Sequence, residues 1–227
     1  DILKYKSRGY ISYLRSENPI KFPLRLYPDI YTNNNVIKNF PNKDVDGVNI
    51  PKEKQITHLK IIGCPMMNLQ LETYNQMIHQ ISGKFGSFDQ VGLMLSNMTY
   101  PVIGGDHKSK IGAVGFNNVF NKHKNGNTIS YSFKHDDNKS MFTPEHIKQY
   151  SSKLYTILNN VKDKDGIIFI YSQFIPSGIL PLALMLEYNG FTFINGGKEE
   201  ILLDCDSKKP KLEVNGKKLN FIIISGD

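Results

Sequence analysis

The sequence predicts an α/β fold in which helices flank a parallel sheet, and three stretches of the chain carry this prediction. The first is Ile167–Tyr171, where every residue is apolar or aromatic, as in a parallel strand buried on both faces. The second is Ile179–Tyr188, an apolar helix that the following Asn-Gly pair should end. The third is Phe221–Ser225, a second apolar run. We expect the two runs to be parallel neighbours in one sheet, joined through the helix.

Turn signals and apolar periodicity predict the remaining elements. Thr143-Pro144-Glu145 is a good helix start, because it offers a capping hydroxyl, a proline at the first helical position and an acid in the first turn. The other elements that we expect are a strand at Ile56–Cys64, a helix with an apolar stripe from Leu71 to Ile81 that ends at Gly83, a helix continuing to Val161, a strand at Phe191–Ile194, and a hairpin of Glu199–Asp204 with Lys211–Val214 followed by a turn at Asn215-Gly216.

Composition limits the function classes. The net charge of +7 and the isoelectric point of about 9.2 favour a polyanionic partner such as nucleic acid. The two cysteines, Cys64 and Cys205, form no disulfide framework, so we expect a reducing intracellular compartment. No apolar run approaches the length of a membrane span, so we expect no membrane partner. We interpret the chain, which begins at Asp1 without a methionine, as part of a longer protein.

Several segments resemble the superfamily 2 helicases and translocases of large cytoplasmic DNA viruses, which are of the Swi/Snf-like type. They are Arg-Gly-Tyr-Ile-Ser-Tyr-Leu-Arg at 8–15, Phe-Pro-Leu-Arg-Leu-Tyr-Pro at 22–28, Tyr-Ser-Gln-Phe at 171–174 and Leu-Glu-Tyr-Asn-Gly-Phe at 186–191. The resemblance implies the first half of the second RecA-like lobe at 142–227, the exit of the first lobe with a helical connector at 1–103, and a polar flexible connector at 104–141. It also implies a viral factory in the host cytoplasm, or a virion, as the location.

The resemblance implies a parent enzyme that hydrolyses ATP with Mg²⁺ between two lobes, and a missing first lobe as a partner. Such an enzyme needs a glycine-rich phosphate loop with lysine, an acidic pair for Mg²⁺ and arginines on the γ-phosphate. The sequence contains no such loop or acidic pair, and the segment at 104–110 has the wrong glycine-to-lysine spacing. We therefore expect no catalytic residue and no cofactor in this chain, and neither tight ATP binding nor hydrolysis by the chain alone.

In the resembled enzymes the second lobe grips the nucleic-acid backbone at strand tips. Ser172, Gln173 and Phe174 follow the first apolar run, and hydroxyl and amide groups suit phosphate oxygens. The alternative is that Ser172 and Gln173 only cap the next helix. Ser225 is a weaker case at the second tip. Arg8 and Arg15 lie in a basic and aromatic N-terminal segment that either contacts phosphates or packs on the missing lobe.

Two function classes compete with a helicase region. One is a non-catalytic α/β module that binds a partner protein through its aromatic N-terminal segment, and the other is a small-nucleotide-binding domain that uses the tip at Ser172. A salt titration of nucleic-acid binding separates the helicase region from the partner-binding module, because contacts to phosphates release counterions.

Overall fold

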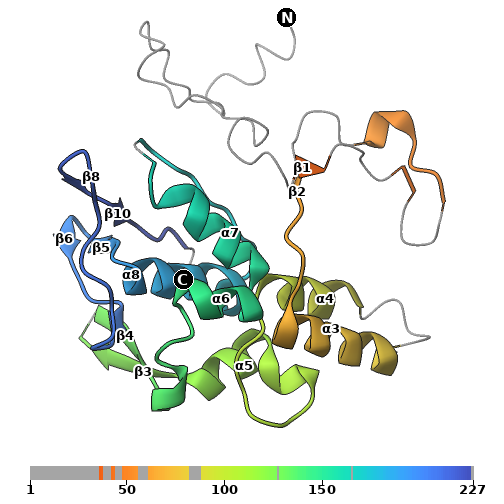
Figure 1. Ribbon diagram of the computed structural model, residues 1–227, viewed down its shortest axis with the longest axis horizontal. Coiled ribbons are helices and arrows are strands. Elements are labelled where there is room, and N and C mark those ends of the chain that lie inside the picture. The colour runs from red at the N-terminus through yellow and green to blue at the C-terminus, as the bar shows by residue number, and fades with distance from the viewer. Residues whose placement is uncertain are drawn as a thin grey trace, which may run out of the picture.

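The computed structural model describes residues 36–37, 42–43, 48–55, 61–81, 88–126, 128–164 and 166–225. Its helices are α3 (Asn68–Ile81), α4 (Phe88–Asn97), α5 (Gly112–Val119), α6 (Pro144–Tyr150), α7 (Ser152–Val161) and α8 (Leu180–Tyr188). Shorter helical turns are η2 (Lys52–Lys54), η4 (His107–Lys110), η5 (Asp136–Asn138) and η6 (Ile175–Ile179), the last of which is a π turn. In Figure 1, α8 lies between the other helices and the short strands on the left.

The strands among these residues are short. They are β1 (Val36–Ile37), β2 (Ile61–Ile62), β3 (Phe120–Asn125), β4 (Thr128–Phe133), β5 (Thr192–Asn195), β6 (Lys198–Glu199), β7 (Leu203–Asp204), β8 (Glu213–Val214), β9 (Lys217–Lys218) and β10 (Asn220–Phe221). They form small sheets of order β10-β5-β6, β3-β4-β7, β1-β2 and β8-β9, with parallel pairing of β10 to β5 and of β4 to β7. The fold is therefore mixed α/β.

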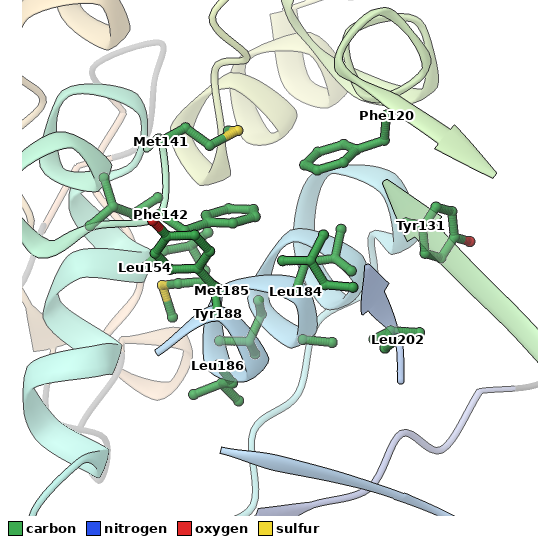
Figure 2. Close-up of a cluster of buried hydrophobic side chains, with 14 of the residues drawn as sticks. Phe120, Tyr131, Met141, Phe142, Leu154, Leu184, Met185, Leu186, Tyr188 and Leu202 are labelled. Carbon is green, nitrogen blue, oxygen red and sulfur yellow. The ribbon is translucent and has the colours of Figure 1, made fainter. Parts of the chain in front are cut away.

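The core is built around α8. Its residues from Pro181 to Tyr188 are all buried, which explains why the helix is apolar on every face instead of along one stripe. Figure 2 shows Leu184 and Met185 of this helix close to Phe120 and Phe142. Phe142 is fully buried, and its ring lies 6.0 Å from that of Phe120 and 6.1 Å from that of Tyr188. Aromatic side chains from three distant segments thus complete one core.

A buried carboxylate attaches the C-terminal strands to α8. Glu187 is 7% exposed, and its Oε2 accepts hydrogen bonds from the backbone N–H groups of Leu202 at 2.9 Å and Leu203 at 2.7 Å. Its Oε1 accepts from Lys208 Nζ at 3.2 Å. Two backbone donors that would otherwise be buried without an acceptor are therefore satisfied by one side chain.

The predicted helices are mostly present. The helix expected at Ile179–Tyr188 is confirmed as α8, and Gly190 after it has φ +94°, with Pro210 O only 2.2 Å from where a Cβ would lie. The expected helix over Leu71–Ile81 lies within α3, although Gly83 is outside the described residues. The helix from Thr143 begins as predicted, but it breaks at Ser151, whose hydroxyl accepts a hydrogen bond from Leu154 N and so begins α7.

The first predicted strand is wrong. Ile167–Tyr171 forms no strand, and Ile167 and Phe169 are 87% and 84% exposed. A parallel strand buried on both faces needs neighbouring strands and helices on each side, and no strand in the described residues pairs with this run. The apolar composition shows that the segment could be buried in a sheet, but it does not show whether a neighbouring strand is present to pair with it.

The second predicted strand is only partly present. Phe221 pairs in parallel with Phe193 of β5, whereas Ile222 and Ile224 beyond it are 63% and 79% exposed. The expected pairing of Ile167–Tyr171 with Phe221–Ser225 is therefore also wrong, because hydrogen bonding to β5 occupies the start of the second run and the first run forms no strand. The helix-connected RecA-like sheet does not form in these residues.

The segment expected to be a flexible polar connector at 104–141 is instead folded. It contains η4, α5, β3, β4 and η5, and its apolar side chains enter the core: Phe116, Val119, Phe120, Tyr131 and Phe133. The many asparagines and lysines conceal this pattern, since the buried residues are widely spaced among polar ones. The domain limits at 103 and 141 remain a prediction.

The predicted hairpin after Glu199 is also paired differently. Leu203 and Asp204 align with Tyr131 and Ser132 of β4, while Glu213–Val214 pairs with Lys217–Lys218. The predicted turn at Asn215-Gly216 is confirmed, with φ values of +53° and +72° that suit this pair. The strand expected at Phe191–Ile194 is present as β5, and of the strand expected at Ile56–Cys64 the described part contains Ile61–Ile62 as β2.

Candidate nucleic-acid interface

The candidate site is the turn at Ser172–Phe174 that precedes η6. The hydroxyl of Ser172 accepts a hydrogen bond from Phe174 N and donates one to Phe174 O, both at 3.2 Å. This closes a local turn of the kind that serine favours. Gln173, at the apex, is exposed, whereas Phe174 is half-buried. The hydroxyl therefore shapes the turn, and the amide of Gln173 is the polar group that the turn presents to solvent.

Two hydrogen bonds from distant segments hold η6, which directly follows the turn. The hydroxyl of Tyr100 donates to the carbonyl of Pro176, and Ser177 Oγ accepts from Gly112 N at 3.0 Å. Tyr100 is fully buried, and burial raises the pKa of its phenol well above the ordinary value, which keeps the hydroxyl a donor. Gly178 fits closely beneath, since a Cβ there would lie 2.1 Å from Ser172 Oγ. The turn is thus fixed against the start of α5.

These anchors were missed by sequence reasoning. Tyr100 and Gly112 are 76 and 65 residues from their partners in η6, so no local pattern connects them. Ser177, between Pro176 and Gly178, was the available signal, because Pro-Ser-Gly at the start of a helix marks a constrained turn. The geometry shows that the turn is built from residues 100–112 as well as 172–178.

A short basic turn, η4, immediately precedes α5. The carboxylate of Asp106 accepts a hydrogen bond from Ser109 N at 3.1 Å and so begins η4, in which Lys108 is exposed. Only Ile111 separates η4 from Gly112, and the N–H of Gly112 donates to the hydroxyl of Ser177. The η4 turn is therefore next in sequence to a residue that contacts η6. Lys108 is therefore an exposed cation close in sequence to the residue that bonds Ser177.

Among the described residues, the structure places no other predicted site residue beside this turn. Ser225 is exposed in the segment after β10, and the expected strand pairing that would have placed it beside Ser172 does not form. Arg8 and Arg15 lie outside the described residues. Among the residues that the structure covers, no group of three histidine, cysteine, aspartate or glutamate side chains is placed to hold a metal ion.

One comparison with known proteins found a relative. A protein of Acanthamoeba polyphaga mimivirus named "Putative ATP-dependent RNA helicase" is 25% identical to this chain over 225 residues. The match covers 84% of this chain and only 18% of the relative. No protein-family model and no solved structure matches the chain. Within the described part of the chain, every helix is too short or too polar to span a membrane.

Proposed function

We propose that this chain is a region of an ATP-dependent helicase or translocase that contributes contacts to the nucleic-acid backbone. The observation that carries the proposal is the likeness to a protein named as an RNA helicase, because it extends over 84% of this chain. The net charge of +7 agrees with a polyanionic partner. Since the sequence contains no phosphate loop or acidic pair, ATP and Mg²⁺ would be bound by other segments of the enzyme.

In this proposal Gln173 and Lys108 supply the contacts. A side-chain amide donates hydrogen bonds to phosphate oxygens, and a lysine neutralises them, without reading the base sequence. The buried phenol of Tyr100 and the hydroxyl of Ser177 keep the turn in one conformation, so that little entropy is lost when a strand binds. The half-buried Phe174, at the end of the turn, and the exposed Ser225 are further candidate contacts.

The finer parts of the proposal rest on the resemblance. They are a RecA-like second lobe completed by segments outside this chain, phosphate contacts from Arg8 and Arg15, a first lobe as intramolecular partner, and action in a viral factory or virion. The parallel pairing of β10 with β5 is compatible with such a lobe.

The test is a salt titration of binding to single-stranded and double-stranded RNA and DNA. Gln173→Ala should weaken binding about two- to tenfold, the loss of one hydrogen bond, and leave the slope of log affinity against log salt unchanged because an amide releases no counterion. Arg8→Ala or Arg15→Ala should flatten that slope by about one unit if either touches a phosphate. Fluorescence anisotropy with labelled oligonucleotides measures both quantities.

The matched control is Gln90→Ala, which removes an exposed glutamine near the start of α4 and should bind like the wild type. If Gln90→Ala and Gln173→Ala weaken binding equally, Gln173 makes no specific contact. A flat salt response of the wild type would reject backbone binding itself.

One observation favours a second candidate, the non-catalytic partner-binding module. Ile167–Tyr171 exposes five consecutive apolar or aromatic residues, and single scattered ones are far more usual on a soluble surface. A flat salt response, together with self-association that Phe169→Ser reduces, would favour this second candidate.

A further inference from the structure

One folded segment of this chain is basic and contains no acidic residue. Residues 107–135 contain five lysines and three histidines but no aspartate or glutamate. The formal net charge of the whole chain is +7, so this segment of 29 residues accounts for +5 of it. In the structure the segment is η4, α5 and the β3–β4 hairpin, and the last of these has no role in the site described above.

The hairpin joins the core through its base and through Tyr131 of β4. Phe120 and Phe133 face each other in the register, are both buried, and have ring centroids 5.0 Å apart. Beyond this pair, every residue of β3 from Asn121 to Asn125 is exposed. The hairpin is therefore fixed by these aromatic side chains, and β3 beyond Phe120 presents its side chains to solvent.

The two faces of the outer part differ in chemistry. Because side chains alternate along a strand, Lys122 and Lys124 lie on the same face, opposite Tyr131 and Ile129. The other face holds only uncharged hydrogen-bonding groups and one imidazole, in the register pairs Asn121–Ser132, His123–Ser130 and Asn125–Thr128. His123 Nε2 also lies 2.7 Å from Ser132 Oγ, so the two strands are joined across this face.

The acidic residues near the hairpin do not neutralise the charge of Lys122 and Lys124. Asp136, the first acid after the hairpin, pairs with Lys139 at 2.7 Å, and this pairing lowers the pKa of its carboxyl. Asp204 of β7 aligns with Ser132 near the base of the hairpin and away from Lys124. The lysine face thus keeps its positive charge.

The hairpin is also within reach of the turn at Ser172–Phe174. Gly112, the first residue of α5, is bonded to Ser177, and β3 begins directly after the last residue, Val119. Eight helical residues span roughly 12 Å, a distance that a nucleic-acid backbone covers in a few nucleotides. The same strand could therefore contact both places.

We infer that the β3–β4 hairpin is a second contact for the nucleic-acid backbone, in which Lys122 and Lys124 neutralise two phosphates. The inference rests on the proposed function, since it requires that the chain bind nucleic acid. The contact is independent of base sequence, because lysines, amides and hydroxyls recognise phosphate and sugar. It also explains why a chain with 21 acidic residues has none within this segment.

The test compares the wild type with the double variant Lys122→Ala/Lys124→Ala in the same salt titration, using labelled single-stranded and duplex oligonucleotides. The expected result is a slope flatter by about 1.4 units on single strands and about 1.8 units on duplex, for two phosphates no longer neutralised. Protection of the two lysines from acetylation by bound oligonucleotide, read by mass spectrometry on the wild-type chain, gives a second measurement that needs no variant.

The matched control is Lys52→Ala/Lys54→Ala, which removes two exposed lysines at the same spacing from η2. If the wild type binds and both double variants change the slope equally, or neither lysine of the hairpin is protected, the inference is overturned while the proposed function stands. If the wild type itself shows no salt-dependent binding, both are overturned. An unchanged melting temperature confirms that the variant is folded.

Discussion

Glu187→Ala is expected to lower the free energy of unfolding by about 3–5 kcal/mol, the range for removing one partner of a buried ion pair. The carboxylate is buried and accepts hydrogen bonds from Leu202 N, Leu203 N and Lys208 Nζ. Without it, two buried backbone donors lose their acceptor, and Lys208 Nζ keeps only its hydrogen bond to Leu203 O. Since domains are stable by only about 5–15 kcal/mol, the variant should be mostly unfolded under mild denaturation.

Two further variants make this prediction specific. Glu187→Gln keeps the size and one acceptor oxygen, so it should lose less stability than Glu187→Ala. Glu199→Ala removes a carboxylate that also bonds two lysines, Lys211 and Lys218, but on the exposed surface, where the change in stability should be small. Urea unfolding followed by circular dichroism compares the three variants. Equal losses for Glu187→Ala and Glu199→Ala would contradict the role of burial.

Glu199 also provides a pH test of this surface pairing. Its hydrogen bonds to Lys211 and Lys218 lower the pKa of its carboxyl from 4.5 to about 2. A depressed pKa contributes stability that is present above the ordinary pKa and is lost as the pH falls from about 4.5 towards 2. The difference in the free energy of unfolding between the wild type and Glu199→Ala should therefore become smaller as the pH falls through that window.

Phe142→Ala is the second large effect, with an expected loss of about 3–5 kcal/mol. The side chain is fully buried and contacts the rings of Phe120, Phe133 and Tyr188, so its removal leaves a cavity at the centre of the core. The carbonyl of Phe142, which accepts from Asn189 Nδ2 at 2.8 Å, is kept in the variant. The loss therefore measures packing and not the backbone hydrogen bond.

The control for this packing prediction is Ile103→Ala, because Ile103 is 96% exposed and should change stability little. Both variants are measured by urea unfolding, in which a shifted midpoint at an unchanged slope indicates a pure change in stability. A loss below about 1 kcal/mol for Phe142→Ala would mean that the residues around it form no common core.

The sequence by itself determined the local features of this protein. A run of apolar residues closed by Asn189-Gly190 is a helix in most environments, so α8 was predictable, and Asn215-Gly216 makes a turn because this pair tolerates positive φ. The residues of the Ser172–Phe174 turn were also visible, because a serine hydroxyl bonds to the backbone two residues on. The net charge and the composition also follow directly from the sequence, because they do not depend on contacts between residues.

Only the tertiary structure decided which apolar residues are buried. Ile167–Tyr171 and the residues of α8 are similarly apolar, yet α8 lies among aromatic side chains from distant segments whereas Ile167–Tyr171 has no strand partner in the described residues. The same holds for 104–141, whose few apolar residues reach the core through α5 and β4, and for Tyr100 and Gly112, which anchor the turn. Burial and strand pairing each require two segments that meet in space. The local sequence pattern describes only one of these segments and does not show which other segment will contact it.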